Sequence, residues 1–166
     1  KERNGCKILV VDPRRTRTAA KADMYLSLRP GTDVAFIWGM LWHIFKHGWE
    51  DKEFIRTRVF GMDEVQKEVA RWTPAEVERV TGLNEQQVYG AAKLLSDNRP
   101  GCVVWCMGGT QHTTGNNNTR AYCILELALG NVGKSGAGTN IFRGHDNVQG
   151  ATDFGVTSDS LPGYYG

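Results

Sequence analysis

Three short apolar runs along the chain have the pattern of buried β-strands. Lys7–Asp12 (KILVVD) is nearly continuously apolar and is closed by Pro13, as expected for a strand of a parallel sheet covered on both faces. Met24–Leu28 predicts a second short strand. Cys102–Met107 (CVVWCM) predicts a third, which is apolar enough for the centre of a sheet.

The segments between these runs carry apolar residues at helical spacing. A helix is predicted from Thr32 or Asp33, either of which can cap it, to about His47, and Gly48 provides its stop. One stripe of this helix collects Ala35, Trp38, Leu41, Trp42 and Phe45. The stripe predicts that the helix faces the core.

A longer helical stretch runs from Asp51 to Asp97 and is interrupted by short breaks. Within it, Thr73 precedes Pro74, and Glu76 stands near the third helical position, which is the pattern of a capped helix start. A further helix is predicted over Asn117–Leu129, where Gly130 ends it.

The order of these elements predicts an α/β fold. We expect a three-layer, Rossmann-like parallel sheet flanked by helices, with a small helical insertion at about 51–97. Residues 1–166 are expected to form a single domain, and about 131–166 to form a loop segment that serves a binding or active site.

The composition is that of a globular protein, since 40% of the 166 residues are hydrophobic and 23% are charged. The formal net charge of +2 gives no case for a nucleic-acid partner, although a positive excess lies around Arg14, Arg15 and Arg17. With no apolar run of about 18 residues, we expect no direct membrane insertion. The ends of the chain, KERNG and LPGYYG, lead us to expect a domain taken from a longer polypeptide.

The four cysteines lack the spacing of a metal site, since there is no CxxC pair. We therefore assign no metal ligand in this chain. Cys6, Cys102 and Cys106 lie in or beside apolar runs, which predicts small buried thiols and favours a reducing compartment. His43 and His47 share a helix face, but their aromatic neighbours favour packing over metal binding.

Polar side chains follow the predicted strands at the point where each strand ends. Asp12 and Arg14 come directly after the first strand, where ligands bind in open parallel sheets. A carboxylate there can accept from a ribose hydroxyl or a guanine N–H edge, and an arginine can pair with phosphate. The alternative is an Asp-Pro turn with solvated arginines.

Two further segments also place polar residues directly after a predicted strand. Leu28–Asp33 (LRPGTD) puts a turn and a helix start after the second strand, where it is either a ligand site or a plain helix cap. Met107–Arg120 (MGGTQHTTGNNNTR) joins the third strand to a helix and could cradle a phosphate or dinucleotide. Its glycine spacing does not satisfy GxGxxG, which disfavours an ordinary nicotinamide-binding fold.

The segment Gly138–Gly150 (GTNIFRGHDNVQG) carries Arg143, His145, Asn147 and Gln149 among glycines and has no apolar periodicity. These side chains can direct several hydrogen bonds at one polar ligand, and the glycines allow the backbone close to it. A solvated surface loop is the alternative.

Taken together and in this order, five motifs resemble the molybdopterin oxidoreductase family, most of all the catalytic α subunits of its metal-dependent formate dehydrogenases. They are VVDPRRTRTAAKAD, LRPGTD, MGGTQHTTG, GNVGKSGAGTN and RGHDNVQGATD, and the run RGHDNVQGATDFG followed by SLPGYYG is the most specific portion. The resemblance covers nearly the whole chain.

The resemblance implies a central piece of a larger subunit that binds two molybdopterin guanine dinucleotides around one Mo or W atom. It implies roles for motif residues at three places. The nucleotide contacts would be Asp12, Arg14, Leu28, Gly31 and Asp33. The pterin contacts would include Met107, Gln111 and His112, and the residues near the metal would be Arg143, Gly144, His145 and Gln149.

The same resemblance implies that Arg143 faces formate, whose carboxylate a guanidinium can hold by charge-assisted hydrogen bonds, and that His145 belongs to the same catalytic pocket. It implies a [4Fe–4S] cluster outside this chain, iron–sulfur and flavin- or NAD-binding partner subunits, and a cytoplasmic enzyme, with a periplasmic location as the alternative. The functional alternatives are a relative acting on another substrate such as nitrate, and a non-catalytic scaffold like the large subunit of NADH dehydrogenase.

Overall fold

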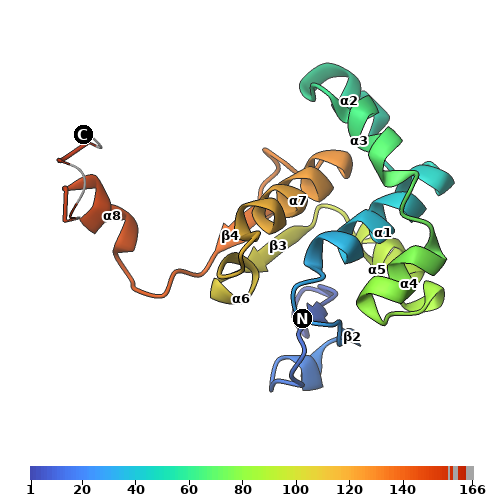
Figure 1. Ribbon diagram of the computed structural model, residues 1–166, viewed down its shortest axis with the longest axis horizontal. Helices are drawn as coiled ribbons and strands as arrows, with labels where there is room; N and C mark the ends of the chain where they lie inside the picture. Colours follow the sequence, from blue (N-terminus) through green and yellow to red (C-terminus); the bar gives the residue numbers. More distant parts are fainter. Residues whose placement is uncertain (157, 159–160, 164–166) are drawn as a thin grey trace.

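Helices form most of the body of the molecule, and an extended arm leads away from it in the computed structural model (Figure 1). The structure describes residues 1–156, 158 and 161–163. The sequence motif SLPGYYG therefore lies mostly outside the described residues, and only Leu161–Gly163 of it are placed.

The strands form two parallel ladders. In the first, β1 (Leu9–Val11) pairs with β2 (Met24–Leu26), so that Leu9 lies opposite Met24. In the second, β3 (Cys102–Trp105) pairs with β4 (Gly138–Ile141), so that Trp105 lies opposite Ile141. Each pair is joined through a crossover, as parallel pairing requires.

Helix α1 (Asp33–His47) is the central packing element. It lies against α3, α4, α5 and α7, and its residues Leu41 and Ile44 are completely buried. Gly48 ends it in the left-handed conformation with φ of 67°, and its N–H donates to the carbonyls of Ile44 and Phe45. The buried face of α1 is wider than the predicted stripe, since Phe36, Ile37 and Met40 also lie in the core.

The predicted helical insertion contains the helices α2 to α5, which are labelled in Figure 1. They are α2 (Lys52–Arg58), α3 (Met62–Val69), α4 (Pro74–Thr81) and α5 (Glu85–Asp97). The Thr73 side chain caps α4 as the sequence predicts, and Asn84 forms a reciprocal capping box with Gln87 at the start of α5. These caps satisfy the backbone donors that a helix start leaves without partners.

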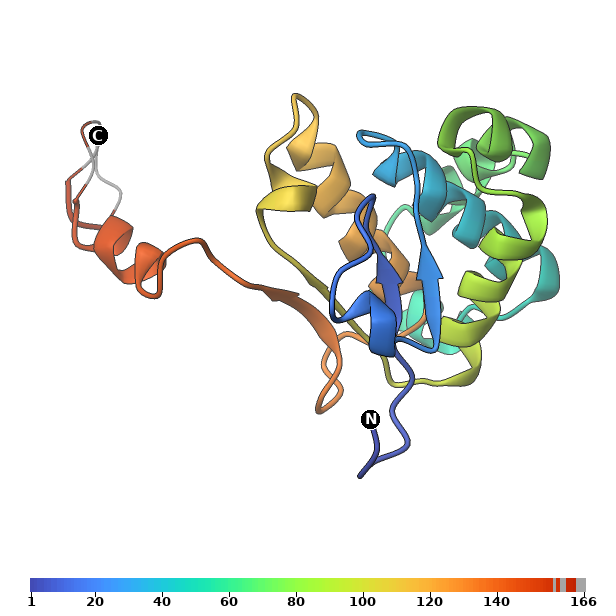
Figure 2. The same cartoon turned by 90° about the horizontal axis from the view of Figure 1, so that it is seen from below.

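The region after β3 begins with a short helix, α6 (Met107–Thr110), which is followed by α7 (Gly115–Ala128). Helix α7 packs against α1 and both strands of the second ladder. The arm follows β4 and carries a last short helix, α8 (Val148–Asp153). Figure 2 shows the same arrangement after a quarter turn, with the arm again leading away from the helices. A 3₁₀ turn, η1 (Ala19–Lys21), lies between β1 and β2.

The α/β class and the parallel strands are confirmed, and several details differ from the sequence prediction. Among the described residues the strands form two separate two-stranded ladders instead of one continuous sheet. The polar loop predicted after β3 contains α6, and the predicted loop 131–166 contains β4 and α8. The predicted burial of Cys6 and Cys102 is wrong, since Cys6 is exposed ahead of β1 and Cys102 is exposed at the first position of β3.

His43 packs as the sequence predicts. Its ring is buried between Trp42, with ring centroids 5.0 Å apart, and Tyr89, at 5.4 Å. Burial lowers the pKa of His43, which favours the neutral ring. In the part of the chain that the structure describes, no group of three or more His, Cys, Asp or Glu side chains is placed to hold a metal ion.

Candidate functional site

The loops that follow the strands lie at one side of the molecule. Because the strands within each ladder are parallel, their carboxyl ends point the same way. Figure 2 shows the segments after β1 and β2 on the same side as α6 and the start of α7. The predicted nucleotide and pterin segments thus follow strands of two different ladders and lie on the same side of the molecule.

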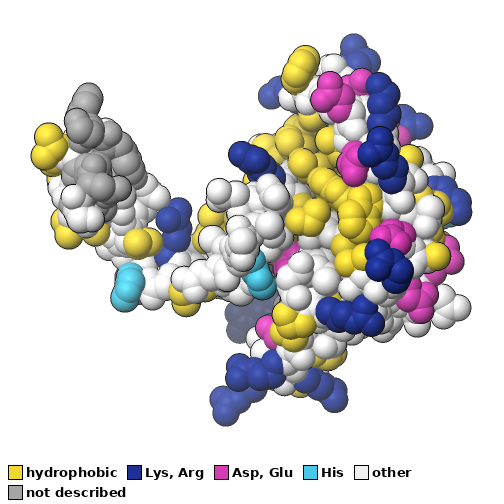
Figure 3. Space-filling view, viewed as in Figure 1, with side chains coloured by type: hydrophobic (Ala, Val, Ile, Leu, Met, Phe, Trp, Pro, Cys, Tyr) yellow, Lys and Arg dark blue, Asp and Glu magenta, His cyan; other side chains and the backbone are white. Residues whose placement is uncertain are grey.

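After β1, Asp12 is half-buried, and its Oδ1 accepts a hydrogen bond of 2.7 Å from the backbone N–H of Arg14. The Tyr25 hydroxyl donates to the Asp12 carbonyl at 2.9 Å and fixes the strand end. Arg14, Arg15 and Arg17 have exposed side chains. Figure 3 shows Lys and Arg side chains gathered over this N-terminal unit. The segment after β1 therefore carries one carboxylate held by the backbone and three exposed arginine side chains.

After β2, the residues of LRPGTD have different environments. The Leu28 side chain is buried in the core, so only its backbone can face a ligand. Gly31 has φ of 83°, and a Cβ added to it would meet no atom within 4 Å, so its backbone is open to approach.

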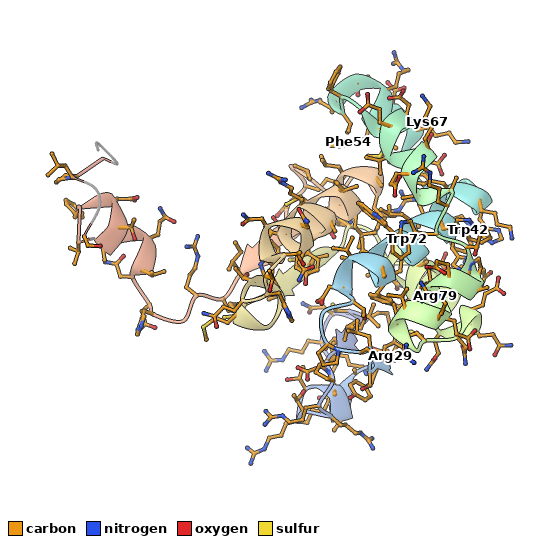
Figure 4. All side chains as sticks on the ribbon, in the orientation of Figure 1. Arg29, Trp42, Phe54, Lys67, Trp72 and Arg79 are labelled. Atoms are coloured by element: carbon orange, nitrogen blue, oxygen red, sulfur yellow. The ribbon has the colours of Figure 1, made fainter. Side chains whose placement is uncertain are left out.

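Arg29 turns away from the strand ends and toward α4 (Figure 4). Its Nη1 donates to the carbonyl of Arg79 at 2.6 Å and to that of Val80 at 3.2 Å. A cation at the end of a helix satisfies carbonyls that have no partner within the helix. Arg29 is therefore a structural residue that fastens the LRPGTD segment to the helical body.

Asp33, the last residue of the motif, contacts Tyr122 of α7. The Tyr122 hydroxyl of α7 donates to Asp33 Oδ1 at 3.0 Å. Burial, together with the neighbouring charge of Asp33, raises the pKa of Tyr122 and keeps its hydroxyl protonated. Asp33 thus stands half-buried at the start of α1 with one carboxylate oxygen held by α7.

After β3, the turn of α6 presents exposed Met107 and Gln111 side chains. His112 is half-buried, and its Nε2 lies 2.8 Å from the Gly108 carbonyl, which fastens the end of α6 to its beginning. A Cβ added to Gly144 would lie 3.4 Å from the Met107 sulfur. Gly144 of the arm therefore lies against Met107, and both residues are predicted to contact the cofactor.

Arg143, His145 and Gln149 lie on the arm, away from the nucleotide segments (Figure 1). All three are exposed, and Gln149 Nε2 donates to Asp153 Oδ1 at 3.0 Å within α8. The Arg143 and His145 side chains make no hydrogen bond or ion pair with any residue that the structure describes. The structure does not bring them to Asp12 or Asp33.

A groove of about 420 Å³ runs between the start of α1 and one face of α7. Its apolar wall includes Val34, Trp38 and Ile124, and its polar residues are Thr114, Asn117 and Arg120. Gly31 also lines it, so the groove opens beside the predicted nucleotide segment. Its walls are mostly apolar, and it is open to solvent.

The strand-end groups fit a guanine nucleotide that bears phosphates. Asp12 and Asp33 supply carboxylate acceptors, the arginines after β1 supply phosphate donors, and Gly31 leaves room for close backbone contact. The indole N–H of Trp105, at the end of β3, is buried and has no partner among the described residues. It is a donor that a bound ligand could satisfy.

The architecture is an α/β fold in which loops follow the carboxyl ends of parallel strands, the edge at which open α/β sheets usually bind ligands. The chain belongs to the molybdopterin oxidoreductase family, whose model matches residues 1–162.

Named relatives include formate dehydrogenases. The chain is 40% identical over 160 residues to the F420-dependent formate dehydrogenase subunit alpha of Methanocaldococcus jannaschii, covering 96% of this chain and 24% of that protein. It is 39% identical over 163 residues to formate dehydrogenase H of Escherichia coli, covering 98% of this chain and 23% of that protein. The chain thus spans about a quarter of the length of these relatives.

Among solved structures, the acetylene hydratase of Pelobacter acetylenicus resembles the fold with a TM-score of 0.76 and 32% sequence identity. The match covers 79% of this chain and 18% of that chain. Within the described residues, no helix has the length and apolar character needed to span a bilayer.

Sequence reasoning missed three residues that shape this edge: Asn118, Tyr122 and Trp105. Asn118 and Tyr122 lie four residues apart on one face of a predicted helix, directly after a glycine-rich loop. That spacing is a usable signal for a helix that supports a loop. A single tyrosine in an amphipathic helix, however, is more readily interpreted as a core residue than as part of a site.

Proposed function

We propose that this chain is one domain of the catalytic subunit of a formate dehydrogenase, which oxidises formate to carbon dioxide at a Mo or W centre. Two molybdopterin guanine dinucleotides would hold the metal. The observation that carries the proposal is the gathering of the predicted nucleotide groups at neighbouring strand ends. The formate dehydrogenase names of relatives 36–40% identical to the chain support the reaction.

The nucleotide end of one cofactor would lie over the ends of β1 and β2. Asp12 would accept hydrogen bonds from the guanine edge or ribose, and Arg14 would pair with phosphate. Gly31 and the Leu28 backbone would contact the nucleotide closely, and Asp33 would contribute its remaining carboxylate oxygen. Strands β1 and β2 and the start of α1 would hold the backbone of these residues in place.

The pterin end would lie along α6 and the beginning of the arm. Met107, Gln111 and His112 would contact it from the body, and Gly144 and Gln149 from the arm. The close approach of Gly144 to Met107 supports this arrangement, because it joins the two segments at one point.

Arg143 would hold formate. Its planar guanidinium can donate two parallel hydrogen bonds to the carboxylate and stays cationic throughout, so it orients the C–H bond without taking part in electron transfer. His145, two residues away, would line the same pocket. Arg143 and His145 are exposed and without described partners in this chain, as expected for side chains that act on a ligand.

Oxidation of formate breaks the C–H bond and yields carbon dioxide, a proton and two electrons. The bound metal–pterin group supplies the electron acceptor, and the protein supplies binding, orientation and charge. Electrons would leave through a [4Fe–4S] cluster elsewhere in the subunit and through iron–sulfur and flavin- or NAD-binding partners in the cytoplasm. Because the M. jannaschii relative is named F420-dependent, NAD and F420 are the two acceptors to compare.

Replacing Arg143 tests the role in formate binding. In the full-length subunit, Arg143→Lys should lower formate turnover about 100-fold, because lysine loses the bidentate geometry, while metal and pterin content stay unchanged. Arg71→Lys, in the turn that follows α3, is the matched control, because its side chain is largely exposed in an ion pair with Glu68.

Unchanged formate turnover in Arg143→Lys would refute the assigned role. Acetylene is the competing substrate, favoured by the likeness to a protein named acetylene hydratase. Acetylene consumption without formate oxidation would replace the proposed reaction and leave the cofactor site in place.

A further inference from the structure

Two side chains of α7 connect the nucleotide segment to the pterin segment. Asn118 and Tyr122 are one helical turn apart and so lie on the same face of α7. Tyr122 donates to Asp33, in the segment after β2, and Asn118 donates to Gly109, in the segment after β3. Neither has a role in the function proposed above.

The first connection is the hydrogen bond from Tyr122 to Asp33. The Tyr122 hydroxyl donates at 3.0 Å to Oδ1 of a residue 89 positions earlier in the sequence. A hydroxyl that donates to one oxygen of a carboxylate restricts the orientations that the carboxylate can adopt. Oδ2 makes no hydrogen bond to Tyr122 and would be the oxygen available to a ligand.

The second connection is to α6. Asn118, which is fully buried, donates from Nδ2 to the Gly109 carbonyl at 2.8 Å. The Tyr122 ring lies directly on the same residue, since a Cβ added to Gly109 would be 2.5 Å from the Tyr122 oxygen and 3.1 Å from its ring. Only glycine fits there. The turn that carries Met107 and Gln111 is therefore fixed relative to α7.

The third connection is to the end of β3. The rings of Trp105 and Tyr122 pack with their centroids 5.0 Å apart. Tyr122 thus contacts the last residue of β3, the turn of α6 and the first residue of α1. These are three separate segments of the candidate site, and one side chain fixes the spacing between them.

We infer that Tyr122 and Asn118 are positioning residues that set the orientation of the Asp33 carboxylate and its distance from the pterin-facing turn of α6. The inference rests on the proposed nucleotide site and adds to it the residues that preorganise that site. A carboxylate held in one orientation binds a guanine N–H edge more tightly, because no rotational freedom is lost on binding.

Tyr122→Phe tests the inference, because it removes only the hydroxyl and keeps the ring on Gly109. The full-length subunit, prepared in a host that makes no pterin cofactor, is titrated with GDP by calorimetry. We expect GDP binding to weaken up to about tenfold in Tyr122→Phe, because the Asp33 carboxylate then has to be ordered by the ligand. Tyr89→Phe on α5 removes a hydroxyl far from the site and should leave GDP affinity unchanged.

A double-mutant cycle with Asp33→Asn separates positioning from general stability. If Tyr122 acts through Asp33, the effect of Tyr122→Phe should largely disappear when Asp33 is already Asn. Weakened binding in Asp33→Asn with unchanged binding in Tyr122→Phe would overturn the inference and leave the nucleotide site intact. Unchanged binding in both Asp33→Asn and Asp12→Ala would overturn the nucleotide site, and the inference with it.

Discussion

A buried carboxyl on α7 gives the fold a measurable dependence on pH. Glu126 is 1% exposed and faces Asn131, which accepts a 3.1 Å hydrogen bond from the Gly101 N–H at the start of β3. Oε2 of Glu126 and Nδ2 of Asn131 are buried without a hydrogen-bond partner among the described residues. Burial raises the pKa of Glu126 from 4.5 to about 7, while Asn131 and the Gly138 N–H oppose the rise.

The direction of the pH effect depends on whether the folded or the unfolded chain loses the Glu126 proton at the lower pH. Between pH 4.5 and about 7 the unfolded chain releases the Glu126 proton, whereas the folded chain keeps it. The free energy of unfolding therefore falls as pH rises through this window, by about 3 kcal/mol, and is constant above it. Glu126→Gln keeps the shape of the side chain and removes the titration, so the variant should lose this pH dependence.

Hydrogen exchange of the α7 amides in the full-length protein measures the effect locally. Between pH 5 and pH 8, after correction for the intrinsic exchange rate, wild-type α7 should open about 100-fold more readily at the higher pH. Glu126→Gln should show little change, and the exposed Glu78→Gln on α4 should behave as wild type. A wild-type α7 that opens equally at both pH values would refute the buried, protonated Glu126.

Two further predictions concern the core and the nucleotide site. Leu41→Ala removes a completely buried side chain of α1 and should destabilise the fold by about 2–5 kcal/mol. Chemical denaturation measures this loss of stability. In the same experiment Phe60→Ala, at a fully exposed position, should have little effect. Asp12→Ala in the full-length subunit should reduce the pterin content of the purified protein, with exposed Asp63→Ala on α3 as control. A normal pterin content in Asp12→Ala would contradict the assigned nucleotide contact.

The elements with strong local signals could be predicted from the sequence. Helices α1 and α4 carry their signals within a few residues, in Gly48 and in the Thr73 cap. Strands β1 and β3 were predicted from their apolar runs. A run of this kind indicates a strand but not its partner, which is why the two separate ladders could not be predicted.

Strand β4 was missed because its side chains carry no strand pattern. Gly138–Ile141 (GTNI) is mostly small and polar, and three of its residues are exposed. It is a strand because it pairs with β3, which lies far earlier in the sequence. Pairing between distant segments overrides local preference, and local preference is all that a single sequence displays.

In the candidate site too, local features could be predicted from the sequence, whereas contacts between distant residues could not. Residue types and strand ends predicted the positions of Asp12 and Asp33, whereas the contact from Tyr122 to Asp33 joins residues 89 positions apart. Leu28 was selected as part of a motif, and the structure shows that its side chain belongs to the core. A motif marks a segment, and the fold decides which atoms of that segment face the ligand.

Elemental analysis of the purified full-length protein tests the central claim most directly. A metal–pterin formate dehydrogenase should contain a single Mo or W atom per polypeptide together with several Fe atoms. Folded protein that contains Fe but neither Mo nor W would contradict the account, and it would remove Arg143 from any catalytic role.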